Sequence, residues 1–510
     1  MSVTLYVAGE FYGIQKYVLG ITAAGGGQAK RLRARSFVVQ ALEDVVVSQI
    51  CAGTPARTVM GGGGQFVLAL EQSPGCEERL RALRLDLQQR LFAELGGELG
   101  FNLGWGSTVE AARHARGMER HRPWACLMIG PEGWLHKQMR LDSVSPPCDI
   151  CRKRRASKQW TSDGPPEDVC DRCDRDRRIG TLIPRVLGVE LTEQDAEERL
   201  LGRGVRFRRA DDRGDQPPGR TFQRYVPVHP DKDKTLLTFE QIAAQSNGDE
   251  LLGVLKADVD NCGKLIDEHV RAGSLDVLSQ ISKELDDFFS VSLQRTIAGD
   301  ARWKAIYTVF SGGDDLLLVG PWDIMLDFAA SVEAAFAVGP GRTYGLKLSA
   351  GVSFMPPRIP VRHGVKRAED EMAKAKQGPK NRCATLRGVW EWEALRRILG
   401  GGRELVKWWG CDAARKGTLR RLYRIVLSAG PGAHLWAWEL GRNFPRRDDH
   451  RAEHRLFREW GERVLANWGN QSMDETRASL LYALTATRTR SKDERRDQQT
   501  EVGNARRARR

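Results

Sequence analysis

The sequence of 510 residues lacks any run of about 20 apolar residues, the length that a membrane-spanning helix requires. Its first residues, MSVTLYVAGEFYG, also lack a basic segment followed by a long apolar stretch, which a secretory signal would need. We therefore expect a cytoplasmic protein that has no membrane partner.

Cysteine is scarce outside one short segment. Of the ten cysteines, four lie between residues 148 and 173 and the others are scattered, which argues against a disulfide framework. The four form two pairs, Cys148-x2-Cys151 and Cys170-x2-Cys173, separated by 18 residues. This spacing is typical of a zinc ribbon, in which four thiolates surround Zn²⁺ and leave no open position. We predict a structural zinc site; disulfides or a site without metal are the alternatives.

The charged residues show a modest excess of one sign. Lys and Arg number 80 against 66 for Asp and Glu, which gives a formal net charge of +14. This excess favours a polyanionic partner such as RNA or DNA, although a surplus of this size also serves solubility alone. Residues 30–36, KRLRARS, are a candidate phosphate contact on a helix, and a solvated charge stripe is the alternative.

The order of apolar patterns predicts an α+β fold with two related halves. Each half contains a strand, a helix, a glycine hairpin and a further helix, which is typical of a ferredoxin-like unit, and we expect one antiparallel sheet in the second. Between them lie the cysteines and a polar linker, and after them a helical region and a basic tail expected to be disordered. The predicted units are residues 1–140, 141–185, 186–250, 251–390, 391–487 and 488–510.

The hairpins of the two halves differ in their acidic residues. Residues 61–65 read Gly-Gly-Gly-Gly-Gln, whereas residues 311–315 read Ser-Gly-Gly-Asp-Asp. Glycine permits a tight turn with positive φ and the close approach of a phosphate. We therefore expect the chemistry at the second hairpin and a structural or substrate-cradling role for the first.

Three aspartates are the candidate catalytic residues. Asp314 and Asp315 occupy the tip of the second hairpin, and Asp258 ends another apolar strand in the segment KADVDN. If these strands are neighbours, the three carboxylates meet and repel one another unless a cation binds. Carboxylates hold Mg²⁺ or Mn²⁺, and two such ions serve phosphoryl transfer by stabilising the attacking and leaving oxygens. The alternative is an ordinary exposed turn, since Gly and Asp are common turn formers.

Residues beside these aspartates are predicted to help bind a nucleotide. Strand alternation puts Asp260 on the face of Asp258, so it is assigned as a helper. Basic residues at the end of the helix near residue 376 suit triphosphate oxygens, or they are simply cations at a helix C-terminus. The predicted nucleotide-binding residues are Ser311, Gly312, Gly313, Asp260, Asn261, Lys376 and Lys380.

Several motifs together resemble the catalytic palm that GGDEF cyclases and the CRISPR polymerases share. They are SGGDD, ADVDN, the strand LSAGVSF and the helix AEDEMAKAK followed by KN. In the N-terminal half, GEFYGIQKYV, KRLRARSF and GGGGQFVLAL are similar to the first palm of the large subunit of type III CRISPR effector complexes. A four-cysteine element between two palms and a helical C-terminal domain complete that family's order, so the resemblance covers nearly the whole chain.

The resemblance implies two nucleotidyl cyclase-like palm domains, a zinc-ribbon insertion and a helical C-terminal domain. It also implies an RNA-guided antiviral complex that converts ATP into cyclic oligoadenylate when target RNA binds, with Asp314, Asp315 and Asp258 as the metal-binding catalytic residues. The implied partners are the crRNA, the target RNA, repeat-type backbone subunits, and small helical subunits on the C-terminal helices. Many members begin with an HD nuclease domain; no His-Asp dyad precedes the first palm here, so DNA cleavage is not expected. Glu10 stands where the pattern leads us to expect Asp.

Three other hypotheses stay open. A stand-alone GGDEF-like cyclase is disfavoured by the duplicated palm, the zinc insertion and the Asp-Asp ending of the hairpin. A non-catalytic RNA-binding scaffold is expected to have lost the acidic pair, which this sequence retains. A templated RNA polymerase would need fingers and thumb domains, for which no segment is evident.

Overall fold

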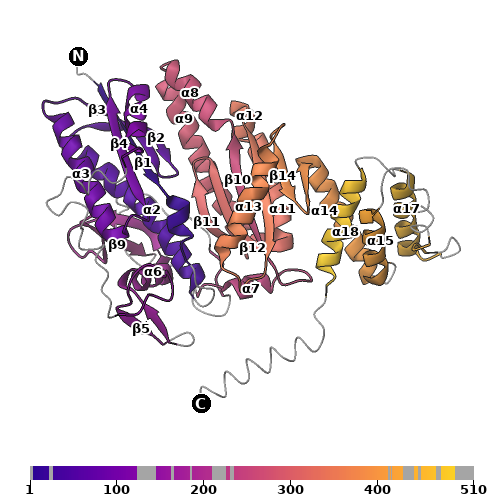
Figure 1. Ribbon diagram of the computed structural model, residues 1–510. Coiled ribbons are helices and arrows are strands. Elements are labelled where there is room, and N and C mark those ends of the chain that lie inside the picture. Colours follow the sequence, from indigo (N-terminus) through magenta and orange to yellow (C-terminus); the bar gives the residue numbers. More distant parts are fainter. Residues whose placement is uncertain are drawn as a thin grey trace.

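The fold is α+β, as predicted, with two palm domains side by side and a helical region at one end (Figure 1). Within the described residues, no helix is both long enough and apolar enough to cross a membrane. Of the predicted basic tail, only Arg488 is described, so the expectation of disorder lies outside the described residues. The computed structural model describes residues 4–21, 27–122, 145–161, 166–183, 186–209, 226–229, 235–411, 414, 416–428, 442–445, 450–466 and 472–488.

The first palm is a four-stranded antiparallel sheet of order β2-β3-β1-β4, the order of a ferredoxin-like fold. On one face, Val7 of β1 packs in a core with residues of α2 and α3; on the other, Ala8 packs with α4 and with Leu278 of the second palm. Because successive residues of a strand point to opposite faces, burial of both faces explains why β1 is apolar from Leu5 to Gly9. The elements are β1 (Thr4–Tyr12), α1 (Ile14–Val18), α2 (Gln28–Cys51), β2 (Ala56–Gly62), β3 (Gln65–Glu71), α3 (Cys76–Leu95), β4 (Gly100–Gly106) and α4 (Val109–Glu119).

The second palm repeats this order in β11-β12-β10-β13 and extends the sheet with β14 and β15. The expectation of a wholly antiparallel sheet is wrong at one pair. Strands β13 and β14 are parallel, because helix α13 carries the chain back along the sheet between them. The elements are β10 (Leu252–Asp260), α8 (Cys262–Arg271), α9 (Leu275–Asp286), the π-helix η3 (Asp287–Ser292), α10 (Leu293–Gly299), η4 (Ala301–Trp303), β11 (Tyr307–Gly312), β12 (Asp315–Pro321), α11 (Trp322–Val338), α12 (Pro340–Tyr344), β13 (Lys347–Met355), α13 (Val361–Lys376), β14 (Arg382–Thr385) and β15 (Gly388–Glu391).

One glycine in the fourth strand of each palm lets a helix pack directly against the sheet. A Cβ on Gly104 would lie 2.1 Å from the backbone nitrogen of Arg116 in α4. A Cβ on Gly351 would lie 2.2 Å from the carbonyl oxygen of Ala368 in α13. Neither space admits a side chain, because both interfaces are close-packed. The halves therefore share a detail of packing as well as a strand order, which supports a duplication.

The segment between the palms is more structured than a linker. Residues 186–209 form a three-stranded sheet of order β7-β9-β8, although residues 186–250 were expected to be linker. In β9, Val205 and Phe207 are buried between arginines, so the high charge concealed a period-2 pattern. The elements are β5 (Lys158–Trp160), β6 (Glu167–Val169), α6 (Asp171–Leu182), β7 (Val186–Leu191), β8 (Glu198–Leu200), β9 (Arg203–Arg209) and α7 (Phe239–Ala243).

The C-terminal region is helical, as predicted, and has an apolar core of its own. Helix α14 joins it to the second palm, because Trp392 and Leu395 near its start lie in the palm core whereas Leu405 and Trp408 near its end lie in the helical core. Figure 1 places this region on the side of the second palm that is remote from the first. The described helices are α14 (Trp392–Gly410), α15 (Lys416–Ser428), α17 (Ala452–Ala466) and α18 (Ser472–Ala486).

Candidate active site

The three predicted catalytic aspartates lie together at one end of the second palm. Strands β10 and β12 are hydrogen-bonded neighbours, and their register places Asp258 directly opposite Asp315. Asp314 occupies the turn between β11 and β12, and its carbonyl oxygen accepts a hydrogen bond of 3.0 Å from the backbone of Val259. The structure thus brings the three residues together, while their role as metal ligands stays a prediction.

The surroundings of Asp258 and Asp315 disfavour the ionised forms of these two carboxyl groups. Burial raises the pKa of Asp315 to about 6, with a further contribution from Asp258 and Asp314, while Lys256 acts in the opposite direction. Burial also raises the pKa of Asp258, and its ion pair with Lys376 counteracts this shift. The Oδ1 atom of Asp315 is buried and has no hydrogen-bond partner among the described residues. A divalent cation fits this set of donors, since it would satisfy that oxygen and relieve the repulsion.

The three carboxylates do not yet have the spacing of a closed metal site. Among the described residues, the one group of possible ligands whose atoms all lie within 4.8 Å of one another is the cysteine cluster. Asp258 is instead paired with Lys376, and Asp314 is exposed. A cation therefore has to compete with Lys376 for Asp258.

A cavity of about 650 Å³ separates the aspartates from the first palm. Asp258, Asp314 and Asp315 form one side of it, and the N-terminal residues of the first palm form the other. Its charged and polar lining from outside the predicted set consists of Glu10, Tyr12, Gln15, Lys16, Gln65, Arg120 and Lys256. The predicted carboxylates thus face a pocket that both palms build.

The other predicted binding residues lie beside or behind this cavity. Asp260 is buried, and its Oδ2 accepts hydrogen bonds from the Ser349 hydroxyl at 2.7 Å and the Asn381 backbone at 3.0 Å. Lys380 donates to the side chain of Asn261 at 2.8 Å. These contacts tie the end of β10 to the loop after α13. Nucleotide binding by Asp260, Asn261 and Lys380 stays a prediction.

The glycine hairpin is held from behind by the π-helix. Buried Ser311 donates its hydroxyl to the carbonyl of Phe289 at 2.6 Å, and the backbone of Gly313 donates to Asp286 at 3.4 Å. Ser311, Gly312 and Gly313 are therefore placed as the framework of the tip. Any contact of theirs with a nucleotide also stays a prediction.

Sequence reasoning missed several charged residues of the cavity. Lys256 could have been predicted as a residue of the site, because it lies two residues before Asp258 and strand alternation puts both on one face. No sequence pattern could have predicted that Arg120 lines the cavity. It comes to the cavity from the end of α4, beyond the segments that showed a motif, and it forms an ion pair with Glu10.

The cysteine cluster has the geometry of a structural zinc site. All four cysteines are buried, and the Sγ atoms of Cys151 and Cys170 lie 3.9 Å apart. Four thiolates arranged tetrahedrally at about 2.3 Å from Zn²⁺ give sulfur–sulfur distances of this size. The cluster therefore fits Zn²⁺ and leaves no position open for chemistry.

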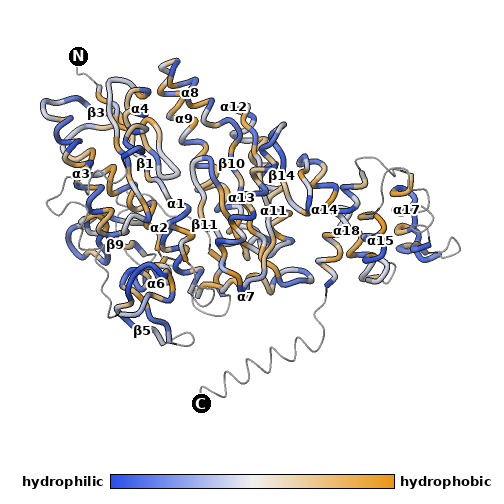
Figure 2. The backbone as a smooth tube through the Cα atoms, in the orientation of Figure 1, coloured by the Kyte–Doolittle hydropathy of each residue, from blue (hydrophilic) through white to orange (hydrophobic). Residues whose placement is uncertain are grey.

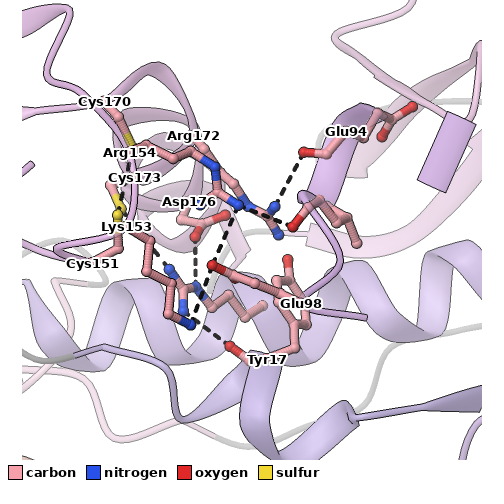
Figure 3. A network of polar contacts seen from close by, with 12 residues as sticks. Tyr17, Glu94, Glu98, Cys151, Lys153, Arg154, Cys170, Arg172, Cys173 and Asp176 are labelled. Carbon is pink, nitrogen blue, oxygen red and sulfur yellow. Dashed lines mark hydrogen bonds and ion pairs between the residues drawn. The ribbon is translucent and has the colours of Figure 1, made fainter. Parts of the chain in front are cut away.

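A buried polar network joins this cluster to the first palm (Figure 3). Arg35 forms an ion pair of 2.7 Å with Asp176 in which both side chains are fully buried, and it donates to the carbonyl of Tyr17 at 2.9 Å. Arg172 stacks over the ring of Tyr17. The network explains how α6, hydrophilic along most of its length in Figure 2, packs against α2.

The basic segment KRLRARS has a different role from both of its proposed ones. Arg31, Arg33 and Arg35 are buried, with Arg35 in the network just described, so they form neither a phosphate-binding surface nor a solvated stripe. A sequence cannot distinguish these cases, because the partner Asp176 lies 141 residues away in the chain.

Comparison with known proteins assigns both palms. The family model for the second palm domain of Cas10/Cmr2 matches residues 251–384, and that for domain B of the Csm1 subunit matches residues 3–118. Both palms of the chain are thus palm domains of the Cas10/Csm1 type found in type III CRISPR systems. The chain shares 25% identity over 515 residues with the Cas10/Csm1 single-strand-specific deoxyribonuclease of Thermococcus onnurineus, which covers 86% of this chain and 65% of that protein. A shorter match of 138 residues to Cas10/Csm1 of Enterococcus italicus is 36% identical and covers 26% of this chain and 17% of that protein.

Solved Csm1 structures share the Cas10/Csm1 fold of this chain. The Csm1 chain of an apo Csm1–Csm4 cassette aligns with a TM-score of 0.70 and 19% identity, covering 95% of this chain and 70% of that one. A Csm1–Csm4 cassette in complex with one ATP aligns with a TM-score of 0.68 and 20% identity over the same shares. Another, in complex with cA3, aligns with a TM-score of 0.68, 19% identity and the same coverage. The chain spans 65% of the Thermococcus relative, and the predicted absence of HD-type DNA cleavage stays a prediction.

Proposed function

We propose that this Cas10/Csm1 chain is a nucleotidyltransferase that converts ATP into cyclic oligoadenylate within a type III CRISPR effector complex. The observation that carries the proposal is the convergence of Asp258, Asp314 and Asp315 on a cavity that both palms line. The Csm1–Csm4 cassettes bound to ATP and to cA3 support the choice of substrate and product.

In the proposed reaction, the 3′-hydroxyl of one adenosine attacks the α-phosphorus of an ATP, and the bond to pyrophosphate breaks. Asp258, Asp314 and Asp315 would hold the divalent cations, Mg²⁺ or Mn²⁺. When bound, these ions supply the Lewis acidity that activates the hydroxyl and offsets charge on the departing pyrophosphate. Repetition of the step lengthens the chain. The ring closes when the terminal 3′-hydroxyl attacks the α-phosphorus of the chain's own 5′-triphosphate and the bond to pyrophosphate breaks.

The remaining charges of the site have roles that follow from their places. Lys256 lies in β10 on the face of Asp258 and lines the cavity, so it suits the phosphates next to the aspartates. Lys376 is freed when a cation takes Asp258, and its ammonium can then pair with a triphosphate oxygen. Arg120 and Lys16 of the first palm face the same cavity and give it a cationic wall for a second nucleotide.

We further propose the assembly partners that the family resemblance implies. These are the crRNA and target RNA, the repeat-type backbone subunits, and small helical subunits that dock on the C-terminal helices. Exposed Leu427 of α15 and Leu456 of α17 are apolar contacts available for the small subunits. Several solved structures of Csm1 contain it together with Csm4, which supports a partner of the same kind here.

The test uses the assembled complex with ATP, Mg²⁺ and target RNA, with products identified by mass spectrometry. We expect cyclic adenylates from the wild type and none from the Asp314→Ala/Asp315→Ala double variant. Asp370→Ala is the matched control, because this aspartate is exposed on α13 and ion-paired only with Lys366 among the described contacts. Cyclic adenylate production by the double variant at the wild-type rate would refute the proposal. Cyclic di-GMP made by the lone chain would favour the stand-alone cyclase, and no turnover with any partner would favour the scaffold.

A further inference from the structure

Helix α9 belongs to the second palm but packs against the sheet of the first. Leu278 is buried with Val59 and Val67 of the first palm. Near the start of the helix, Asp276 forms an exposed ion pair of 2.7 Å with Arg57. The helix therefore contacts both palms along its length, and a change in its position is transmitted to both.

The glycine hairpins of the two palms touch each other at their tips. A Cβ on Gly62 would lie 3.5 Å from the Cα of Gly313, and a Cβ on Gly313 would lie 3.5 Å from the backbone nitrogen of Gly63. Gly62 and Gly313 also have positive φ values of 134° and 62°. A Cβ at either position would be in ordinary van der Waals contact, so the positive φ values, which glycine adopts without strain, account for glycine at both tips.

One row of polar side chains on α9 and η3 holds both tips. Ser282 accepts a hydrogen bond from the backbone of Gly61 at 3.2 Å and donates to its carbonyl at 3.1 Å. Asp286 accepts from the backbone of Gly313 at 3.4 Å and from the Ser290 hydroxyl at 3.0 Å. Ser290 also lies 3.2 Å from the carbonyl of Ser311, within hydrogen-bond distance. The row is spaced i, i+4, i+8, so it follows one face of the helix.

The row ends in an irregular part of the helix. Residues Asp287–Ser292 form a π-helix, a rare conformation that recurs at functional sites. In this stretch the carbonyl of Phe289 accepts the Ser311 hydroxyl, and its ring is fully buried in the core of the second palm. The π-helix is thus anchored to the palm core on one side and to the catalytic hairpin on the other.

Asp286 contacts the hairpin without facing the nucleotide cavity. It lines a separate cavity of about 410 Å³, formed with residues of α2 and β2. Its effect on the aspartates therefore acts through the backbone of Gly313, the residue before Asp314.

We propose that the row Ser282, Asp286 and Ser290 is a positioning device that couples the two palms. It fixes the Gly312–Asp315 tip against the Gly61–Gly64 tip and so sets the orientation of Asp314 and Asp315 toward the cavity. The catalytic consequence rests on the proposed function, whereas the mechanical coupling of the tips does not. Asp286 is the central positioning residue.

The test compares Asp286→Ala, Asp286→Asn and Ser282→Ala in the full chain. Asp287→Ala is the matched control, because Asp287 is exposed, directly follows Asp286 and lines the same cavity of about 410 Å³. Hydrogen exchange is followed at residues 61–64 and 311–315. We expect Asp286→Ala to raise exchange at both tips and Ser282→Ala to do the same, while Asp286→Asn, which keeps an acceptor oxygen, and Asp287→Ala resemble the wild type.

Activity in the assembled complex provides the second measurement. We expect Asp286→Ala to lower kcat about 10- to 100-fold with a smaller change in KM for ATP, because the misplaced groups act in the chemical step. Asp286→Asn should restore most of kcat. Exchange confined to the tip next to each substitution, or an unchanged kcat for Asp286→Ala in an active complex, would overturn the inference. A wild-type complex that makes no oligoadenylate, with exchange coupled between the tips, would refute the proposed function and leave the coupling standing.

Discussion

The first palm places Glu10 opposite Gln65 where its central strands end, and the second palm places Asp258 opposite Asp315 at the same point. The hairpin registers correspond as well, with Gly62 opposite Gln65 and Gly312 opposite Asp315. The two sites are thus built on one backbone plan.

The difference between the two palms is the number of carboxylates and what neutralises them. Glu10 is buried and is paired with Arg120 and, at 3.6 Å, with Arg116. The second palm gathers three aspartates around two ammonium groups, Lys376 at Asp258 and Lys256 near Asp315, and leaves an oxygen of Asp315 unsatisfied among the described residues. One carboxylate beside two guanidinium groups leaves no excess negative charge, whereas three carboxylates with two ammonium groups do. We infer from this comparison that the shared backbone plan favours a bound cation only where its carboxylates outnumber its basic groups.

The largest expected effect comes from giving the second tip the sequence of the first. Asp314→Gly/Asp315→Gln leaves Asp258 alone, so we expect ATP turnover by the assembled complex to fall by at least about 1,000-fold. The reverse exchange, Gly64→Asp/Gln65→Asp, should create no activity in that background, because Arg116 and Arg120 still neutralise Glu10. Turnover is measured as pyrophosphate release, and unchanged circular dichroism serves as the folding control. Activity from the exchanged first palm would contradict the charge argument.

The second-largest expected effect is a loss of stability in the first palm, because the cysteine element packs against that palm. Asp176→Ala leaves Arg35 buried without its carboxylate, and breaking such a pair costs about 3–5 kcal/mol. Urea unfolding should show this loss, and hydrogen exchange should place it in α1, α2 and α6. Asp171→Ala, on the same helix but 76% exposed, is the control. Equal destabilisation of the second palm would show that the two domains do not unfold separately.

The smallest expected effect is a pH-dependent stability that arises at Asp315 in the hairpin of the second palm. The pKa of Asp315 is about 6 in the folded protein, above its ordinary value of 3.8, so ionisation destabilises the metal-free fold. This contribution favours folding at acidic pH and is lost as the pH rises through about 6. Asp315→Asn cannot ionise, so it should raise Tm by about 2–4 °C at pH 7.5 without metal, with no gain below about pH 4.

Calorimetry at both pH values tests this, and Gln65→Asn, a neutral change at the matching place in the first palm, is the control. A gain that stays constant from pH 4 to pH 7.5 would count against the elevated pKa. Addition of Mg²⁺ should stabilise the wild type more than Asp315→Asn, because the variant lacks a charged ligand.

Much of the second palm could be predicted from sequence because its signals are local. The apolar strand that leads to Asp258 and the glycine turn before Asp314 each span only a few residues. The same is true of the two cysteine pairs, which lie outside the second palm. Each of these local patterns has few structural interpretations. The three-stranded sheet at residues 186–209 was missed, since arginines alternate with Val205 and Phe207 and mask the apolar period.

The fold of the first palm was predicted, but its long-range contacts were not, because they join residues that are distant in sequence. In the sequence Arg35 belongs to a basic stretch, whereas in the structure it is buried and ion-paired with Asp176. Arg120 lies outside every sequence motif, and the structure shows that it follows α4 and pairs with Glu10. A sequence does not distinguish an arginine that is solvated from one that is buried and ion-paired.

The sequence alone predicts the α+β fold class, the family resemblance, the two Cys-x2-Cys pairs and three candidate catalytic aspartates, because each rests on recognisable local patterns. Only the tertiary structure decided that the basic helix is buried, that two glycine tips meet, and that Ser282 and Asp286 hold them. Those properties depend on which distant backbones approach one another. That approach is set by the packing of α9 against the first palm and has no local signature in the chain.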